Sequence, residues 1–188
     1  SECEASDLLN TLGNDDFLNG IVTDEPDLVC YVGTDGEKFY QYTMLEEASR
    51  KRFIYAYKEN SSHSTIDFVQ RAIIFFGYAP ETIQTDHGGE FTHTQKTNRI
   101  HPFDILCNKL HITHKVLRPR TPWHNGKVER SHRNDQERFY NHLSFYSYDD
   151  LQVQMKRYLY RSNNIPMSVL GWKTPNQKQY ELENMIYI

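Results

Sequence analysis

A short predicted strand that ends in an acid and is followed by two glycines is the first place in this sequence where chemistry could occur. Residues 81–86 have the composition of a short strand, and Asp86 stands at its carboxyl end, directly before His87, Gly88 and Gly89. Ligands of α/β sheets bind at the carboxyl ends of strands, and glycines permit a tight turn beside a ligand. The pattern also fits an aspartate that only caps the turn, so both interpretations stay open on this segment alone.

A second acid, Glu129, lies in a strongly basic segment that begins with a proline-containing loop. Asn125, Glu129 and Arg133 are spaced by four residues, so a helix would carry them on one face. An isolated glutamate among bases usually forms helix ion pairs, each contributing about 0.2–0.5 kcal/mol. The surrounding bases indicate instead a segment that binds phosphates. The candidate DNA-binding residues are Arg118, Arg120, His124, Asn125, Lys127, Arg130 and Arg133.

Together the two segments resemble the motifs around the second and third acids of DDE-type transposases and retroviral-type integrases. Residues 85–91 read Thr-Asp-His-Gly-Gly-Glu-Phe and match the family pattern Thr-Asp-x-Gly-x-Glu-Phe. Residues 122–130 read Pro-Trp-His-Asn-Gly-Lys-Val-Glu-Arg and match Pro-x-x-Asn-Gly-x-x-Glu-Arg. The resemblance spans residues 31–172 and is greatest to bacterial insertion-sequence transposases.

This resemblance implies a transposase or integrase core that hydrolyses DNA to expose a 3′-hydroxyl and then joins that hydroxyl to target DNA. Two Mg²⁺ (or Mn²⁺) ions about 3.5–4 Å apart would stabilise the attacking and leaving oxygens, and Mg²⁺ prefers carboxylate oxygens. Asp86 and Glu129 would each bind an ion, and the bases near Glu129 would bind phosphates. The expected partners are DNA, as element ends and as target, and further copies of the chain in a homo-oligomer.

The first acid of the family motif is the missing part of this resemblance. Its expected position is Val22, and the nearest acids, Asp24 and Asp27, are out of register. Pro26 disfavours a central strand there because it has no backbone N–H to pair. Asp24 is the candidate for the shared metal ligand if the strand is shifted, with Asp27 as second choice. If neither serves, the chain is a catalytically inactive DNA-binding remnant of a transposase; a nuclease of the same fold is a third alternative.

The elements that would position these acids follow from the periodicity of the apolar residues. Three adjacent extended segments come first, and helices then alternate with strands. This order predicts an α/β domain with the RNase H-like fold, a mixed five-stranded sheet with helices on both faces. The predicted strands are residues 28–33, 39–45, 52–58, 81–86 and 113–117, and the predicted helices are residues 64–76, 101–110, 128–140 and a last one that begins after Ser147.

Two local interpretations accompany this prediction. In the strand at residues 52–58, Phe53, Tyr55 and Tyr57 alternate with Ile54 and Ala56, so the two groups should point to opposite faces. Glu46 and Glu47 follow the strand at residues 39–45 and could be catalytic. They stand just before Arg50, Lys51 and Arg52, so we interpret this connection as a solvated hairpin turn.

The charges divide the chain into unlike parts. Residues 1–37 contain ten acids and no Lys or Arg, so residues 38–188 hold 15 of the 25 acids and all 21 bases, a net charge of +6 within a total of −4. A basic body suits a polyanionic partner, although a merely solvated basic surface would have the same charge. We predict an acidic N-terminal arm of uncertain structure (1–27), an integrase-core-like domain (28–175) and a truncated C-terminal tail (176–188).

Composition excludes several other classes of protein. Cys3, Cys30 and Cys107 are too few and too scattered for a disulfide framework, which favours reduced thiols and a cytoplasmic location. Cys107 with His111 and His114 lacks the fourth ligand and the paired cysteines of a structural zinc site. No apolar run approaches the roughly 20 residues that span a bilayer, and no signal peptide is visible, so we expect no membrane partner.

Overall fold

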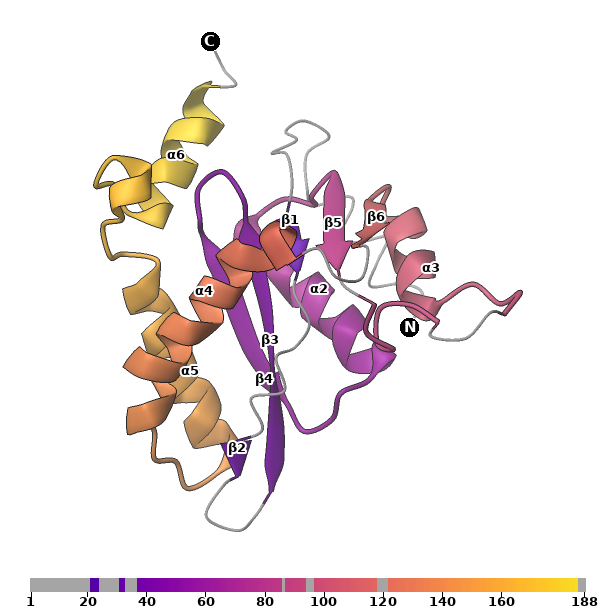
Figure 1. The fold of residues 1–188 in the computed structure, drawn as a ribbon, viewed down its shortest axis with the longest axis horizontal. Coiled ribbons are helices and arrows are strands. Elements are labelled where there is room, and N and C mark those ends of the chain that lie inside the picture. Colours follow the sequence, from indigo (N-terminus) through magenta and orange to yellow (C-terminus); the bar gives the residue numbers. More distant parts are fainter. Residues whose placement is uncertain are drawn as a thin grey trace.

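A mixed β-sheet runs through the centre of the protein, with helices on both of its faces (Figure 1). The computed structural model describes residues 21–23, 31–32, 37–85, 87–93, 97–117 and 122–185, and gives the backbone alone at 21–23, 31–32, 122–129 and 185. In chain order the elements are β1 (Ile21–Thr23), β2 (Tyr31–Val32), β3 (Lys38–Glu46), β4 (Arg52–Tyr57), α2 (Ser62–Phe76), β5 (Thr82–Thr85), α3 (Pro102–Lys109), β6 (Thr113–Val116), α4 (Pro122–Arg138), η1 (Tyr140–His142), α5 (Tyr148–Ser162), η2 (Ser168–Leu170) and α6 (Pro175–Met185).

The sheet combines an antiparallel half with a parallel half. Its strand order is β2-β3-β1-β5-β6, and β4 pairs with β3 off this path, on the edge opposite β1, since both strands pair with Met44 and Leu45. β3 is antiparallel to β1, β2 and β4, whereas β1–β5 and β5–β6 are parallel pairs. The sequence predicted five strands, and the described residues form six, because β1 and the two-residue β2 both pair with β3.

Strand β1 lies within residues 1–27, which the sequence analysis assigned to an arm of uncertain structure. It pairs with β3 on one side and with β5 on the other, so it is a central strand. Pro26 argued against such a strand, but β1 ends at Thr23, three residues earlier. The sheet therefore begins before residue 28, the predicted start of the core domain.

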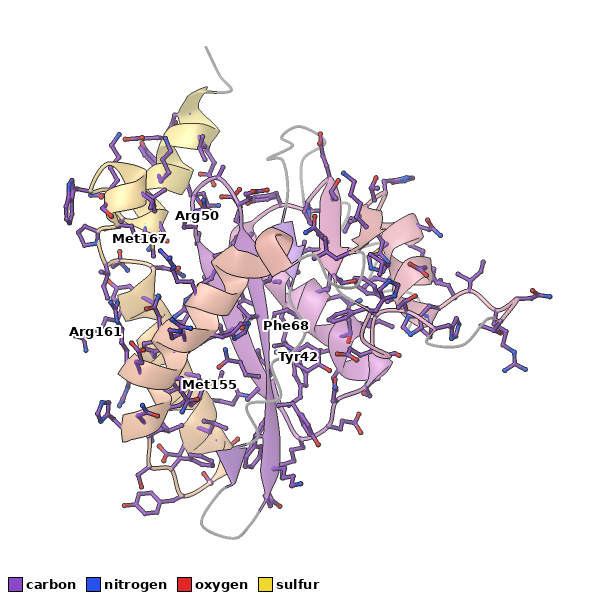
Figure 2. All side chains as sticks on the ribbon, in the orientation of Figure 1. Tyr42, Arg50, Phe68, Met155, Arg161 and Met167 are labelled. Atoms are coloured by element: carbon purple, nitrogen blue, oxygen red, sulfur yellow. The ribbon has the colours of Figure 1, made fainter. Side chains whose placement is uncertain are left out.

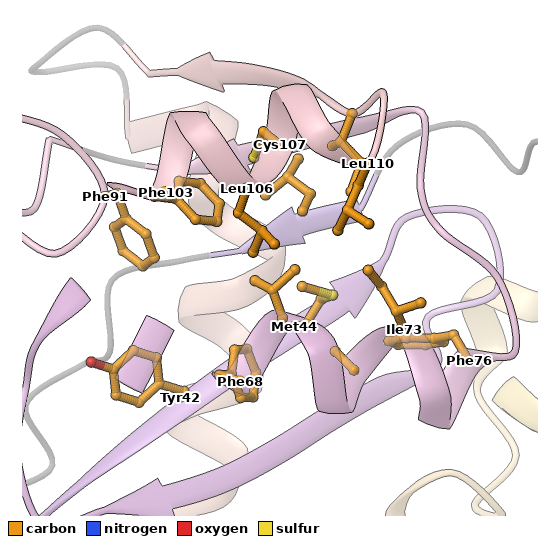
Figure 3. Close-up of a cluster of buried hydrophobic side chains, with 14 residues drawn as sticks. Tyr42, Met44, Phe68, Ile73, Phe76, Phe91, Phe103, Leu106, Cys107 and Leu110 are labelled. Atoms are coloured by element: carbon orange, nitrogen blue, oxygen red, sulfur yellow. The ribbon is translucent and has the colours of Figure 1, made fainter. Parts of the chain in front are cut away.

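The side of the sheet that α2 and α3 cover, here called the α2 face, is packed with aromatic and aliphatic side chains (Figure 3). Tyr42 and Met44 of β3 contact this cluster, as do Phe53, Tyr55 and Tyr57 of β4, which confirms the predicted alternation in β4. Helix α2 contributes a buried stripe at helical spacing: Phe68, Val69, Ala72, Ile73 and Phe76.

The ends of α2 are fixed by the residue types that stand there. The Ser61 side chain accepts a hydrogen bond from the Ser64 backbone N–H, so the helix begins two residues before the predicted start at residue 64. The helix ends at Phe76, as predicted, and Gly77 follows it at φ 84°, a left-handed conformation that favours glycine.

The opposite side of the sheet, here called the α5 face, is covered by α4 and α5 (Figure 1). Ile54 and Ala56 point to this side and pack with Phe39 against the buried stripe of α5, which consists of Leu151, Met155 and Leu159. Ser147 caps α5 by accepting from the Asp150 N–H, as predicted. Helix α4 begins at Pro122, six residues before the predicted start, which agrees with the preference of proline for the first helical turn.

Candidate active site

The predicted catalytic and metal-binding residues are only partly within the described structure. Asp24, Asp27 and Asp86 lie outside the described residues, as do Arg118 and Arg120. The structure therefore describes the elements that adjoin these acids, and not the acids themselves.

Two of those elements are the neighbouring parallel strands β1 and β5. Ile21 pairs with Ile83 and Val22 with Gln84. β1 ends at Thr23 and β5 ends at Thr85, so both carboxyl ends lie at the same edge of the sheet. This is the edge at which α/β folds bind ligands.

The third predicted acid, Glu129, lies in helix α4, for which the backbone alone is described at this position. His124, Asn125 and Lys127 lie in the same helix, also without described side chains. Further along α4 the side chains of Arg130 and Arg133 are exposed. The helix is continuous from Pro122 to Arg138, so the predicted spacing of Asn125, Glu129 and Arg133 along one face is retained.

The loop after Asp86 is closely packed. The carbonyl of Gly88 accepts hydrogen bonds from the backbone N–H groups of Phe91 (3.1 Å) and Thr92 (3.0 Å). A Cβ on Gly88 would lie 2.7 Å from the Glu90 carboxylate, so glycine lets that side chain fold over the loop. Phe91 is buried against Phe103 at a ring distance of 5.7 Å. The glycine and the phenylalanine of the motif are thus explained by packing.

His101 connects this loop to two helices. Its Nε2 lies 3.2 Å from the Gly89 carbonyl oxygen and 3.2 Å from the Ser62 hydroxyl at the start of α2. Its Nδ1 accepts a hydrogen bond from the Phe103 backbone N–H and so caps α3. Burial lowers the pKa of His101, which favours a neutral ring with its proton on Nε2, directed at the loop.

A second histidine supports the end of β5. The Nε2 of His114 lies 2.8 Å from the hydroxyl of Thr85, which is fully buried, and its Nδ1 lies 2.6 Å from the Asp104 carboxylate. A carboxylate on one ring nitrogen fixes the orientation and the proton position of the other. Asp104, His114 and Thr85 therefore form a chain of hydrogen bonds that ends one residue before Asp86.

Helix α4 is held on the sheet by a buried ion pair. Arg52 Nη1 lies 2.6 Å from an oxygen of Asp135, and the side chains are 6% and 1% exposed. The Tyr158 hydroxyl donates to Asp135 over 2.8 Å and the Gln41 amide over 3.2 Å. Asp135 is on α4, so this polar cluster of Gln41, Arg52, Asp135 and Tyr158 ties the helix that contains Glu129 to β3, β4 and α5.

The guanidinium of Arg52 has further partners on both helices of this face. It donates to Ser131 on α4 (2.6 Å) and to Ser162 on α5 (3.0 Å). The backbone of Arg52 is also bound by Asn163, whose side chain accepts from its N–H and donates to its carbonyl. Burial alone would lower the pKa of Arg52, but the Asp135 charge raises it. A buried charge with this many partners is satisfied rather than strained.

The sequence analysis placed Arg52 correctly at the start of a strand, but it treated this residue only as a base beside a solvated connection and missed the cluster. Arg52 is buried, and it occupies the same strand face as Ile54 and Ala56. That alternation was the available signal, because an arginine in phase with inward-facing apolar residues requires a buried acid. Glu46 of the same connection is also buried, and its carboxylate accepts the backbone N–H groups of Ala48 and Ser49.

The described residues contain no group of three or more His, Cys, Asp or Glu side chains arranged to hold a metal ion. That statement does not extend to Asp24, Asp86 and Glu129, whose side chains are not described. Helices in the described ranges also include none that combines the length and the apolar character needed to cross a bilayer.

Comparison with protein families gives two matches to models of an integrase core domain, at residues 23–122 and at residues 110–175. Among curated proteins, the ORF3 protein of Spiroplasma virus SpV1-C74, named as an integrase, is 29% identical to this chain over 136 residues. A retrovirus-related Pol polyprotein from transposon TNT 1-94 of Nicotiana tabacum is 29% identical over 100 residues. These matches cover 68% and 52% of this chain, but only 38% and 7% of those proteins.

Solved structures with the same fold are catalytic cores of retroviral integrases. The HTLV-2 integrase core, solved in complex with magnesium in a trimeric form, matches with a TM-score of 0.65 and 20% identity over 87% of this chain and 97% of that one. A chain of the simian T-cell lymphotropic virus intasome matches with a TM-score of 0.68 and 19% identity over 88% of this chain and 56% of that one. The core of BIV integrase matches with a TM-score of 0.64 and 20% identity over 89% of this chain and 97% of that one. At these identities the likeness shows the RNase H-like fold.

Proposed function

Because the chain belongs to the integrase core domain family, we propose that it is the core of an enzyme that cuts and joins DNA by phosphoryl transfer, with Mg²⁺ or Mn²⁺ as cofactor. The observation that carries the proposal is the parallel pairing of β1 with β5. Val22 pairs with Gln84, and the same register, if it continued for two more residues, would bring positions 24 and 86 opposite each other. Both positions are aspartates.

This register favours Asp24 over Asp27 as the first acid. Asp24 directly follows the last residue of β1, as Asp86 directly follows the last residue of β5. The position first expected from the motif, Val22, lies inside the strand, two residues earlier. A shift of two residues preserves the side of the sheet to which a side chain points, because strand side chains alternate.

The donor set fits a pair of hard divalent cations. Asp24, Asp86 and Glu129 would supply carboxylate oxygens from two strand ends and one helix, and Mg²⁺ prefers such ligands while retaining water molecules. When bound, the ions would activate a nucleophilic oxygen and stabilise the leaving oxygen. The acids would hold the cofactor, and the polar cluster around Arg52 would fix α4 so that Glu129 faces the strand ends.

The predicted basic residues would bind the DNA backbone beside these acids. They lie on α4 or in the segment that precedes it: Arg118, Arg120, His124, Asn125, Lys127, Arg130 and Arg133. Exposed Arg130 and Arg133 can pair with phosphates without losing another partner among the described residues. Contacts of this kind set affinity and position, not sequence choice.

A DNA joining assay tests the proposal. Labelled duplex ends are incubated with the full chain and Mg²⁺ or Mn²⁺, and nicked and joined products are separated by size. We expect Asp24→Asn, Asp86→Asn and Glu129→Gln each to abolish both products, because loss of one shared ligand removes the anchor of the ions. Asp27→Asn is the matched control and should retain activity.

Two results would contradict the proposal. Loss of activity in Asp27→Asn but not in Asp24→Asn would make Asp27 the first acid and reject the extended register. A wild-type chain that binds DNA and neither nicks nor joins it with either metal would be the catalytically inactive, DNA-binding form of this fold. Nicking without joining would identify a nuclease.

We also propose that the chain associates with further copies of itself on DNA. The HTLV-2 core was solved in trimeric and dimeric forms, and the simian virus protein was solved in an intasome. Sedimentation of the full chain with and without duplex DNA measures this. A monomer under both conditions would reject self-association and leave the chemical proposal intact.

A further inference from the structure

A cleft of about 950 Å³ lies beside α4, on the side that is turned toward the end of α5 and the segment after it. Five arginines line it: Arg50, Arg52, Arg130, Arg138 and Arg161. Glu137 is the one acidic side chain among its lining residues within the described structure. We call this feature the arginine cleft. Figure 2 labels Arg50, Met167 and Arg161 along this side of the molecule.

Among the described residues, most of the arginines that line the cleft have no acidic partner. Arg52 pairs with Asp135. The described part of the chain contains no ion pair of Arg50, Arg138 or Arg161, and the last two side chains are exposed. Guanidinium groups bind phosphates through pairs of parallel hydrogen bonds, so a row of unpaired arginines is suited to a polyphosphate strand.

Arg50 adds a second, independent observation. Its Nη1 is buried and has no hydrogen-bond partner among the described residues. Buried donors are nearly always paired in native proteins, so an unpaired one that borders a cleft marks a place where a ligand atom can bind. The backbone of Arg50 has φ 61°, an uncommon conformation for a residue with a side chain.

An exposed tryptophan near the cleft entrance gives the third observation. Trp172 lines the cleft and is 74% exposed. The backbone φ of Trp172 is 64°, which is unusual for a bulky residue. The backbone N–H of Trp172 donates to the Met167 carbonyl over 2.9 Å, beside the β-bridge between Met167 and Lys173. A rigid turn thus holds a large aromatic ring in solvent, where neither core packing nor ordinary backbone preference would put it.

We propose that the arginine cleft binds a single-stranded segment of DNA, with arginines on the phosphates and a base stacked on Trp172. Basic grooves combined with exposed aromatic rings are the general means by which proteins bind unpaired strands. An acidic peptide would satisfy the arginines, but it would not require a flat aromatic surface in solvent.

The cleft is lined by a stripe of α4 that differs from the one on which Glu129 is placed by its spacing. Glu129 and Arg133 lie on one stripe of α4, and Arg133 does not line the cleft. Asn134, Glu137 and Arg138 line it from a different side of the same helix, and Arg130 stands between the two. The inference requires neither the acids nor a metal, so it can hold if the chemical proposal fails.

Binding of a fluorescein-labelled oligothymidine, followed by anisotropy in EDTA, tests the inference on the full Glu129→Gln chain. No DNA is cut under these conditions, so the result is independent of the joining assay. Arg161→Gln and Arg157→Gln remove the same charge from neighbouring turns of α5, and only Arg161 lines the cleft. We expect Arg161→Gln to weaken DNA binding and to lower the slope of log K against log salt concentration by about one. Arg157→Gln should leave the affinity and the slope unchanged.

The stacking contact is tested with Trp172→Leu and an abasic strand. Loss of one stacked base should weaken binding of oligothymidine about 5- to 150-fold, while binding of an abasic deoxyribose-phosphate strand stays the same. Equal binding of oligothymidine by Trp172→Leu and its parent would overturn the inference. Equal effects of Arg161→Gln and Arg157→Gln would do so too, as would displacement of the DNA by polyglutamate at similar concentrations, which indicates an acidic-peptide groove.

Discussion

The two faces of the sheet are stabilised in different ways, although β3 and β4 contribute to both. On the α2 face, alternate residues such as Tyr42, Met44 and Phe53 pack into one cluster of aromatic and aliphatic side chains. On the α5 face, apolar packing is confined to one part, around Phe39 and Ile54. The remainder is the polar cluster under α4.

The difference between an apolar face and a partly polar face matches the helices that these faces position. Apolar packing is non-directional, and on the α2 face the oriented bonds to α2, such as Tyr57 to Asp67 and His101 to Ser62, lie beside the apolar cluster rather than within it. Hydrogen bonds between charged groups require defined distances and angles, so the cluster around Asp135 specifies where α4 lies. In the proposed function, α4 is the helix whose placement matters most, because it carries Glu129.

The largest expected effect comes from breaking the polar cluster. Arg52→Met leaves Asp135 buried without its cation, and loss of one partner of a buried ion pair costs about 3–5 kcal/mol. Urea unfolding followed by circular dichroism measures the free energy of unfolding. The double variant Arg52→Met with Asp135→Leu should regain much of the loss, since no buried charge remains. If the double variant is as unstable as the sum of both single variants, the ion pair is not what holds α4.

The next effect is on activity and concerns the support of β5. Asp104→Ala removes the carboxylate that orients His114 against Thr85, the residue before Asp86. Loss of a direct partner of a metal ligand typically costs about 10–100-fold in activity or metal affinity, so we expect this more distant change to fall at the lower end of that range. The Asp104 side chain is 36% exposed, so its loss should affect stability little. The rate of DNA joining and its dependence on metal concentration are the measurements. A variant with unchanged rate and metal dependence would separate this hydrogen-bond chain from the proposed site.

A smaller effect is expected from a conservative change on the α2 face. Ile73 is 1% exposed within the apolar cluster. Ile73→Val removes one methylene group and should lower the free energy of unfolding by about 0.5–1.5 kcal/mol. The urea midpoint should shift while DNA joining per folded molecule stays constant. A loss of joining larger than the loss of folded protein would mean that this face also positions the site.

The sequence predicted the α2 face better than the α5 face, and the reason is physical. Alternation in β4 and the stripe of α2 are local patterns, and apolar burial depends on little else. The pairing of Arg52 with Asp135 joins residues 83 positions apart, which no local pattern reveals. The start of α4 was placed six residues late because prolines were interpreted as a loop, although Pro122 lies in the first turn of the helix.

For the candidate site, the resemblance of two motifs to the integrase pattern led to Asp86 and Glu129, which stay predictions because their side chains are not described. The first acid could not be chosen by motif spacing, since Asp24 and Asp27 both missed the expected position. The parallel register of β1 on β5 is a tertiary fact, and it is this register that favours Asp24.

The last prediction concerns the dependence of the free energy of unfolding on pH. The α5 face holds the buried ion pair and would be the first place to look for such a dependence, but we expect part of it on the α2 face, at His101. Burial lowers the pKa of His101, with His93 also disfavouring its charge and the Gly89 carbonyl and Asp104 favouring it. The folded chain therefore binds fewer protons than the unfolded chain, and the free energy of unfolding rises with pH. This contribution is complete above the unfolded histidine pKa of about 6.5 and is lost as the pH falls below it.

The change has a structural cause, because a protonated Nδ1 can no longer accept the Phe103 N–H that caps α3. Urea unfolding of the parent and of His101→Gln at about pH 7.5 and about pH 5.5, on either side of the histidine range, measures it. The parent should lose more stability than the variant on acidification. Equal losses in both would assign the acid sensitivity to other groups, and the hydrogen bond from His101 to the loop after Asp86 would then be independent of pH in this range.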